Sequence, residues 1–256
     1  MAFVLKNIYQ KMSSKVKLHR SLNNNGRAAV KESKIINGVT AFILEASEPS
    51  SITQAARLLR SGEVIAMPTD TVYGLACSAT DTKAIQKIYE IKGREENKPV
   101  AICVGNFQQL RKYGEADHLS DELLSLLLPG PVTLVLNRSK HLNNPYLNPG
   151  IHKIGIRIPN FKFIQDVSLD FCSPIALTSA NKSSELSTLN ISEFEKLWPQ
   201  LGAIFDGGQL GQQDEQRAAS TVIDLSSEGV YKIIRRGVCM KHTSDIMNKF
   251  GIKEIL

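Results

Sequence analysis

The sequence lacks the patterns that mark several large classes of protein. No apolar run approaches the ~18 residues of a membrane-spanning helix, and the longest apolar stretch, residues 123–136, is interrupted by Ser125 and by Pro129-Gly130-Pro131. There is no G-x-S-x-G nucleophile motif and no G-x-x-x-x-G-K-[ST] phosphate loop. The glycines at 207, 208 and 211 are not followed by a helical pattern, so they form a poor dinucleotide fingerprint. These absences argue against an integral membrane protein, a serine hydrolase and a P-loop protein.

Metal-binding cysteine and histidine patterns are also missing. The four cysteines, Cys77, Cys103, Cys172 and Cys239, are far apart and form no C-x-x-C, and the five histidines form no H-E-x-x-H or H-x-x-x-H. A zinc site built from side chains is therefore not expected. Isolated cysteines in short apolar stretches are typical of buried thiols in a reducing compartment.

Acidic residues are scarce at the start of the chain. Residues 1–34 contain eight lysines and arginines against one acid, Glu32, which is a charge of +7. Because the whole chain carries +6, residues 35–256 carry −1. A generic basic surface for nucleic acid is therefore not expected on the body of the protein, although this net charge is compatible with a local basic pocket.

Residues 1–34 are a candidate targeting segment. They mix Lys and Arg with Leu, Ile, Val, Ser and Asn, a composition compatible with a mitochondrial transit peptide. A disordered basic tail is the alternative, and the excess of Lys over Arg weakens the targeting interpretation. We expect a cytoplasmic protein, with a mitochondrial pool if this segment directs import.

The rest of the chain alternates patterns typical of strands and helices. Strands are expected at residues 63–67, 99–104, 132–136, 154–159, 174–177, 203–206, 220–225 and 230–235. Helices are expected from a capping box at Ser51 to Gly62, from Asp81 or Thr80 to Gly93, from Ser120 to Leu128, at 160–171 and 191–198, and near the C-terminus. Residues 209–219 are expected to form a flexible loop. We therefore predict one α/β domain at residues 45–240, with a mixed, twisted sheet flanked by helices, and a helical extension at 241–256.

The stretch Pro68–Leu75 is the centre of this arrangement. It reads Pro-Thr-Asp-Thr-Val-Tyr-Gly-Leu and directly follows a short apolar strand. Two hydroxyls, a carboxylate and a phenol at the end of a buried strand usually face a ligand in an α/β protein. The alternative is a turn that satisfies its own backbone groups.

Cations and hydroxyls also gather at the ends of other expected elements. They are Lys92, Arg94, Lys98, Arg157, Ser179, Asn181, Ser220 and Arg235. Each taken singly is more simply a structural ion pair or a solvated end. Together they suit a polyanion such as a nucleotide phosphate, and Arg157, within an apolar strand, needs an anionic partner.

Seven short segments then occur in a specific order. They are Pro68–Leu75, Lys92-x-Arg94, Pro129–Thr133, Ile156–Pro159, Ser179–Asn181, Ser220–Val222 and Ile234-Arg235-x-Gly237. Together they closely resemble the YrdC-domain threonylcarbamoyl-adenylate synthase family over about residues 50–240. The chain looks like the single-domain, animal-type form, whereas larger microbial relatives carry a second domain.

The resemblance implies an activity and a cavity. L-threonine, bicarbonate or CO2 and ATP would give threonylcarbamoyl-adenylate and pyrophosphate in a concave, basic cavity. A separate tRNA threonylcarbamoyl-transferase complex would use the product to modify an adenosine beside the anticodon. Mg²⁺ is expected with ATP, bound mostly through phosphates, and neither membrane association nor stable nucleic-acid binding is expected.

The resemblance also assigns site residues by position within the motifs. Thr71, Arg157 and Ser220 would hold threonine, and Arg157 would pair with its carboxylate. Arg94, Lys98, Lys153, Ser179, Asn181, Ser187 and Arg235 would contact ATP, while Lys92 and Arg94 are the candidate catalytic residues. Cys103 stands where many microbial members have His, so a threonine contact by that side chain is in doubt.

Two other functions compete with this interpretation. A basic concave surface could hold RNA, although the near-neutral body argues against it. A noncatalytic regulator could keep the fold, although the complete set of cationic motif residues argues against that. The sequence leaves the oligomeric state, the choice between bicarbonate and CO2, and the receiving complex open.

Overall fold

The structure is a computed structural model that describes residues 30–36, 38–93, 99–183, 185–211 and 214–255. Its strands are β1 (Val30–Ile36), β2 (Val39–Glu45), β3 (Ile65–Met67), β4 (Gly74–Ser78), β5 (Ala101–Cys103), β6 (Gly114–Glu115), β7 (Val132–Arg138), β8 (Lys153–Arg157), β9 (Ile175–Ser179), β10 (Ile204–Asp206), β11 (Thr221–Asp224), β12 (Val230–Arg235) and β13 (Lys253–Ile255). Its helices are α2 (Pro49–Arg60), α3 (Thr82–Lys92), α4 (Phe107–Tyr113), α5 (Asp121–Leu127), α6 (Lys162–Phe171) and α7 (Met240–Lys249), with 3₁₀ segments η1 (Ile191–Gln200) and η2 (Asp214–Ala218).

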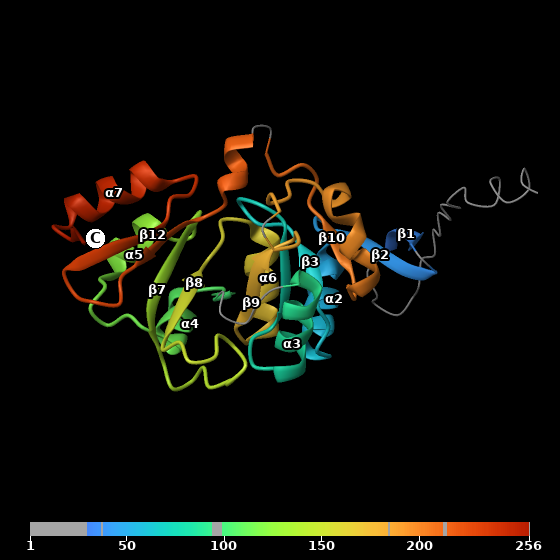
Figure 1. Ribbon diagram of the computed structural model, residues 1–256, viewed down its shortest axis with the longest axis horizontal. Helices are drawn as coiled ribbons and strands as arrows, with labels where there is room; N and C mark the ends of the chain where they lie inside the picture. The colour runs from blue at the N-terminus through green and yellow to red at the C-terminus, as the bar shows by residue number, and fades with distance from the viewer. Residues whose placement is uncertain (1–29, 37, 94–98, 184, 212–213, 256) are drawn as a thin grey trace, which may run out of the picture.

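The described strands form one mixed sheet, as predicted. Their order is β1-β2-β10-β3-β4-β9-β5-β8-β7-β11-β12-β13, and β6 pairs with β7. Figure 1 shows β1 and β2 at one end of the molecule and β12 at the other, so the sheet runs along the long axis.

The described residues contain no helix long and apolar enough to cross a membrane.

The sheet extends past residues 45 and 240 in both directions. Strand β1 pairs with β2, and β2 pairs with β10. Lys34 Nζ lies 2.8 Å from Glu195 Oε1 and 5.4 Å from the ring centroid of Trp198. At the other end, β13 follows α7 and pairs in parallel with β12. The segment 241–256, predicted to be helical, therefore ends in a strand.

Helix α2 begins before the predicted capping box. Pro49 occupies its first turn, where the missing N–H costs nothing, and Ser51 Oγ donates a hydrogen bond to Glu45 O at 2.7 Å. The prediction of Ser51 as a capping residue was therefore wrong. The predicted end near Gly62 is confirmed, because this residue has a φ of +77° directly after the helix.

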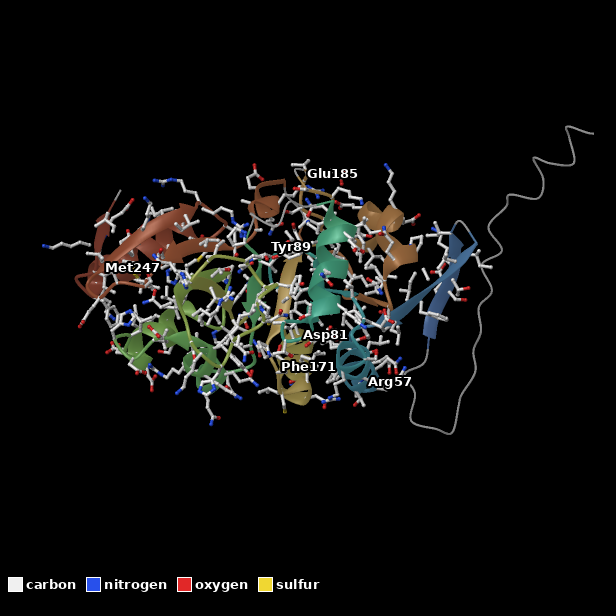
Figure 2. The ribbon with its side chains drawn as sticks, turned by 60° about the horizontal axis from the view of Figure 1, so that its bottom comes forward. Arg57, Asp81, Tyr89, Phe171, Glu185 and Met247 are labelled. Atoms are coloured by element: carbon white, nitrogen blue, oxygen red, sulfur yellow. The ribbon has the colours of Figure 1, made fainter. Side chains whose placement is uncertain are left out.

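The two ends of α3 agree with the sequence prediction. Asp81 Oδ1 accepts hydrogen bonds from the backbone N–H groups of Lys83 (2.8 Å) and Ala84 (3.1 Å), and Gly93 closes the helix with a φ of 56°. Figure 2 shows Asp81 at one end of this helix and Glu185 beyond the other. The helix thus leads from the end of β4 to the segment after Ser179.

Seven of the described elements were not predicted, namely β1, β2, β4, β6, β13, α4 and η2. Strand β4 consists of Gly-Leu-Ala-Cys-Ser, whose small residues have weak strand propensity, and it forms because β3 and β9 pair with it on both sides. Helix α4 is capped by Asn106, whose Oδ1 accepts from Gln109 N at 2.9 Å. The short η2 lies within the segment expected to be a loop. The predicted Ser120 cap of α5 and the β11–β12 pair are confirmed.

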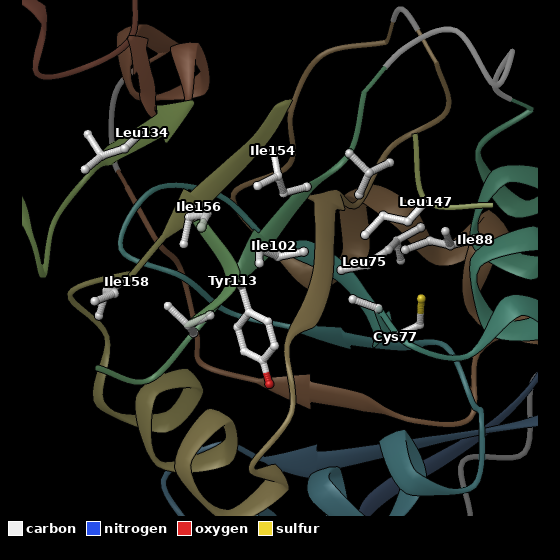
Figure 3. Packing of buried hydrophobic residues seen from close by; sticks show 14 of the residues in the cluster. Leu75, Cys77, Ile88, Ile102, Tyr113, Leu134, Leu147, Ile154, Ile156 and Ile158 are labelled. Atoms are coloured by element: carbon white, nitrogen blue, oxygen red, sulfur yellow. The ribbon is translucent and has the colours of Figure 1, made fainter. Parts of the chain in front are cut away.

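Apolar clusters cover both faces of the sheet. On one face, Ile102, Leu134 and Ile156 belong to one cluster with Ile88 of α3 and Tyr113 of α4 (Figure 3). The same cluster includes residues of α5. On the other face, residues of α2 and α6 pack over β3, β9 and β10. Alternation of side chains along β8 sends Ile154 and Ile156 into the first cluster and Arg157 to the opposite face.

The role of β1 can be tested by two truncations. A chain that begins at residue 30 keeps every described strand, and it serves as the reference for Tm. Deleting residues 1–38 removes β1 and the contacts of Lys34, and Tm should fall by about 4 °C or more, since 1 kcal/mol corresponds to about 2–4 °C in a domain of about this size. Calorimetry measures both, and equal Tm values would show that β1 adds no stability.

Candidate functional site

A cavity of about 1000 Å³ opens on the α6 side of the sheet. Binding sites for small molecules usually measure about 300–1,000 Å³. The described residues that line it include four cations, Lys92, Lys153, Arg157 and Arg235, against two acids, Glu185 and Asp224. The cavity is therefore concave and basic, as the resemblance implied.

Small side chains on the central strands create this hollow. Ala101, Thr133 and Gly155 come from three neighbouring strands and all line the cavity. A Cβ atom added at Gly155 would lie 3.1 Å from Thr133 Cγ2 and 3.3 Å from Ala101 Cβ. A larger side chain at position 155 would thus fill the floor of the cavity.

Arg157 connects β8 to the central motif. Its side chain lines the cavity but is only 8% exposed, and Nη2 donates hydrogen bonds to Asp70 Oδ1 and to Thr71 Oγ1, the latter at 2.8 Å. Asp70 Oδ2 accepts from the backbone N–H of Asn160 at 2.9 Å. Among the described residues, Arg157 Nε has no partner. The expected anionic partner of Arg157 is therefore present within the protein, and it is Asp70.

Thr71 lies behind the cavity wall. Its hydroxyl is buried between Arg157 Nη2 and Thr69 Oγ1, which is 3.1 Å away. Thr69, by contrast, lines the cavity and accepts hydrogen bonds from the backbone N–H groups of Thr71 and Val72. The turn interpretation and the ligand-site interpretation of this stretch thus both describe part of it.

Ser220 belongs to a second polar cluster in the cavity. Ser220 Oγ lies 2.8 Å from Thr133 Oγ1 and accepts a hydrogen bond from Arg235 Nη2 at 2.9 Å. Arg235 Nε also donates to the carbonyl of Ser220 at 3.0 Å. Two predicted residues, Ser220 and Arg235, are therefore in direct contact although one was assigned to threonine and the other to ATP.

Lys92 lies at the opposite rim of the cavity. Its Nζ donates hydrogen bonds to Ser179 O at 2.7 Å and to Asn181 Oδ1 at 3.0 Å. The lysine is buried, and this contact joins the C-terminal end of α3 to the loop after β9. Lys92, Ser179 and Asn181, which the sequence grouped together, thus form one cluster.

Ser187 lies on the same wall. Its carbonyl accepts a hydrogen bond from Arg217 Nη1 at 2.7 Å, and the same nitrogen lies 2.6 Å from Glu193 Oε2. Arg217 therefore joins η2 to the wall segment that contains Ser187. Arg94 and Lys98 lie outside the described residues.

Lys153 forms an ion pair at the edge of the cavity. Its Nζ lies 2.8 Å from Asp224 Oδ2. Burial alone would raise the pKa of Asp224, but hydrogen bonds from Lys153 and Ser226 and the lysine charge outweigh it and hold the pKa below its ordinary value. Asp224 therefore stays ionised and offsets part of the positive charge of the site.

Cys103 is not among the residues that line the cavity, although it lies on the same face of β5 as Ala101. Its thiol lies 3.5 Å from Ser168 Oγ of α6 and packs in the apolar cluster beneath that helix. Burial raises the pKa of the thiol to about 12, while the Ser168 hydrogen bond and the Arg157 charge lower it by less. The residue is thus a neutral part of the core.

Sequence reasoning did not select three residues that the structure places in the site. Asp70 is the partner of Arg157, Thr133 is the partner of Ser220, and Asp224 is the partner of Lys153. Asp70 and Thr133 lie inside motifs that were recognised, so their motif positions were a usable signal. Asp224 carries no such signal, because its role depends on the register of β7, β8 and β11.

The fold and the cavity together define an α/β protein with a basic site for a small anionic ligand. A family model described as telomere recombination, and named for Sua5, YciO and YrdC, matches residues 57–237. The chain belongs to this family, as its motif order indicated.

Individual relatives agree with this assignment. The chain is 48% identical over 204 residues to the threonylcarbamoyl-AMP synthase of Bos taurus and 47% identical over 205 residues to that of Homo sapiens. Both alignments cover 79% of this chain and 73% of the relative. The crystal structure of P. abyssi Sua5 complexed with L-threonine is similar with a TM-score of 0.71 and 29% identity, over 81% of this chain and 60% of that one.

The Lys153–Asp224 pair predicts a specific pH dependence of stability. The folded-state pKa of Asp224 is depressed, so the pair stabilises the protein above the ordinary Asp pKa of about 3.9 and loses this effect as the pH falls through the folded-state value. Lys153→Met should lower Tm at pH 7 by about 1–3 °C, as expected for a partly exposed pair. The Tm difference between the wild-type protein and Lys153→Met should shrink below about pH 4.

Thermal melts between pH 7 and pH 3 measure this effect. Lys162→Met is the matched control, because it breaks the exposed pair of Lys162 with Asp166, and it should leave Tm nearly unchanged. A Lys153→Met deficit that is the same at every pH would contradict the assignment.

Proposed function

We propose that this protein is a threonylcarbamoyl-AMP synthase, an enzyme that condenses L-threonine, bicarbonate or CO2 and ATP into threonylcarbamoyl-adenylate and pyrophosphate. The observation that carries the proposal is the convergence of Arg157, Ser220 and Arg235 on one basic cavity. The fold around this cavity is similar to that of Sua5 complexed with L-threonine.

The reaction asks the protein to position and neutralise charge. The amine of threonine bonds to the carbon of CO2 and releases a proton, or bonds to the carbon of bicarbonate with loss of water, and either reaction gives a carbamate. A carbamate oxygen then bonds to the α-phosphorus of ATP, and the bond from that phosphorus to the bridging oxygen breaks, so that pyrophosphate leaves with the electron pair. Phosphoryl-type transfers need little covalent participation by the protein, and fixed cations stabilise the developing charge.

The polar side chains of the cavity divide these tasks. Arg157 would pair with the threonine carboxylate, and Asp70 holds its guanidinium in place by hydrogen bonding to Nη2. Arg235 and Lys153 would contact the nucleotide. Ser179, Asn181 and Ser187 would do so from the opposite wall.

The Lys-x-Arg segment has a separate part in the proposal. Lys92 orders the loop after β9 through Ser179 and Asn181. Arg94 and Lys98 are proposed to contact the phosphates. Both cations follow α3 closely in the chain, and α3 ends beside this loop.

We also propose that Mg²⁺ enters with ATP. Among the described residues, no group of three or more His, Cys, Asp or Glu side chains could hold a metal ion. The donors present therefore fit an ion held mainly by nucleotide phosphates, which is how Mg²⁺ is commonly bound. The ion would neutralise phosphate charge.

The chemistry of the product suggests what must follow. An acyl-phosphate anhydride reacts readily with water, so a transferase must consume it. We propose that a separate complex transfers the threonylcarbamoyl group to adenosine in tRNA. We further propose that the protein acts in the cytoplasm and that residues 1–34 bring part of it to mitochondria.

ATP turnover should depend on both small substrates. We expect pyrophosphate release from ATP only when L-threonine and bicarbonate are present together, because the carbamate is the attacking group. Mass spectrometry of the same mixture should show threonylcarbamoyl-adenylate. Equal pyrophosphate release without threonine would sink the proposal.

Arg157→Lys should separate binding from stability. Lysine keeps the charge but loses the planar fork that pairs with a carboxylate. We expect threonine use to weaken by about one to two orders of magnitude, roughly the 1.5–3 kcal/mol of a charged hydrogen bond, while ATP affinity changes much less.

Kinetics and thermal stability should be measured on the same preparation. Arg111→Lys is the matched control, because Arg111 binds Asp121 and two backbone carbonyls away from the cavity. A destabilised Arg157→Lys protein with unchanged threonine dependence would mean that Arg157 only pairs with Asp70.

A further inference from the structure

Thr133 has no assigned role, yet it lines the cavity beside Ser220. The two hydroxyl oxygens are 2.8 Å apart, and the residues are 5% and 2% exposed. Both side chains are thus fixed in the wall of the cavity, close to each other and shielded from bulk water.

The sheet holds these two residues at a constant separation. Strands β7 and β11 pair in parallel with Val132 opposite Thr221 and Thr133 opposite Val222. The backbone N–H of Thr221 donates to Pro131 O at 2.9 Å. The contact between the hydroxyls is therefore built on regular backbone pairing.

Packing also restricts the rotamer of Thr133. A β-branched side chain has few χ1 states, and a Cβ atom at position 155 would lie 3.1 Å from Thr133 Cγ2. Gly155 therefore leaves room for the methyl group on the side of β8. With the methyl group placed there, the hydroxyl of Thr133 is directed toward Ser220.

A count of protons shows what the pair offers to a ligand. Arg235 Nη2 donates to Ser220 Oγ at 2.9 Å and so uses one lone pair of that oxygen. The two hydroxyls have two protons, and one of them forms the bond between Thr133 and Ser220. One O–H donor remains, and it can bind an acceptor oxygen in the cavity.

We propose that Thr133 is a positioning residue that holds the Ser220 hydroxyl in the orientation that donates to an oxygen of the bound amino-acid substrate. This inference rests on the proposed function. Without the Thr133 hydroxyl, Ser220 keeps its bonds to Arg235 but can rotate its proton away from the substrate. The variant should therefore lose affinity for the amino acid and keep its affinity for the nucleotide.

The test compares four variants with the wild-type protein. Thr133→Val and Thr133→Ala delete the hydroxyl, and Thr133→Ser keeps it. Thr243→Val deletes another buried hydroxyl, which donates to Cys239 O at 2.9 Å in α7 and is not part of the cavity. Pyrophosphate release measures the KM of L-threonine and of ATP, calorimetry measures L-threonine affinity, and melts measure Tm.

We expect Thr133→Val and Thr133→Ala to raise the KM and Kd of L-threonine about five- to tenfold, the effect of one lost hydrogen bond. Thr133→Ser and Thr243→Val should stay near wild type. The KM of ATP should change less than about twofold in every variant, given that the Arg235–Ser220 contacts remain. If Thr133→Val does not fold, the smaller Thr133→Ala carries the comparison.

Three outcomes would overturn the inference. In the first, Thr133→Val and Thr133→Ala both keep the wild-type KM and Kd of L-threonine. In the second, Thr133→Ser raises these constants as much as Thr133→Val does. In the third, the hydroxyl-deleted variants lower Tm but leave L-threonine binding unchanged. Failure of the proposed function is different, because the wild-type protein itself would then release no threonine-dependent pyrophosphate. If the wild type still binds L-threonine by calorimetry, the variants test Thr133 by affinity alone; if it does not, both proposals fall.

Discussion

The site depends on the buried ion pair between Arg157 and Asp70. A guanidinium that is only 8% exposed needs an anionic partner, and removing one member of a buried pair typically costs about 3–5 kcal/mol. Asp70 supplies that partner from the connection between β3 and β4, and its second oxygen binds the backbone at Asn160. The pair thus holds the central motif against β8 and sets the position of the cation in the cavity.

In the polar clusters of Lys92 and Arg235 a cation is likewise held in place by protein oxygens, but these oxygens belong to neutral groups instead of a carboxylate. Lys92 orders the loop that contains Ser179 and Asn181, and Arg235 orders the Ser220 segment. Each cation is held by protein oxygens before any ligand arrives. Such preorganisation lowers the cost of ordering side chains on binding and suits a reaction in which fixed charges do most of the work.

The hollow itself comes from an asymmetry between the two faces of the sheet. Ile102, Leu134 and Ile156 fill one face beneath helices, while Ala101, Thr133 and Gly155 leave space on the other. The same strands therefore build the core and the floor of the site. A single added methyl at position 155 would press on Thr133, so the shapes of core and cavity are coupled.

The sequence by itself determined the α/β class, the caps of α3 and α5, and the family, because these depend on local patterns and on motif order. It also indicated that Arg157 needed an anion. Only the tertiary structure decided that this anion is Asp70, that β4 is a strand, and that Thr133 meets Ser220. The physical reason is that strand pairing joins residues more than eighty positions apart, and register depends on both partners at once.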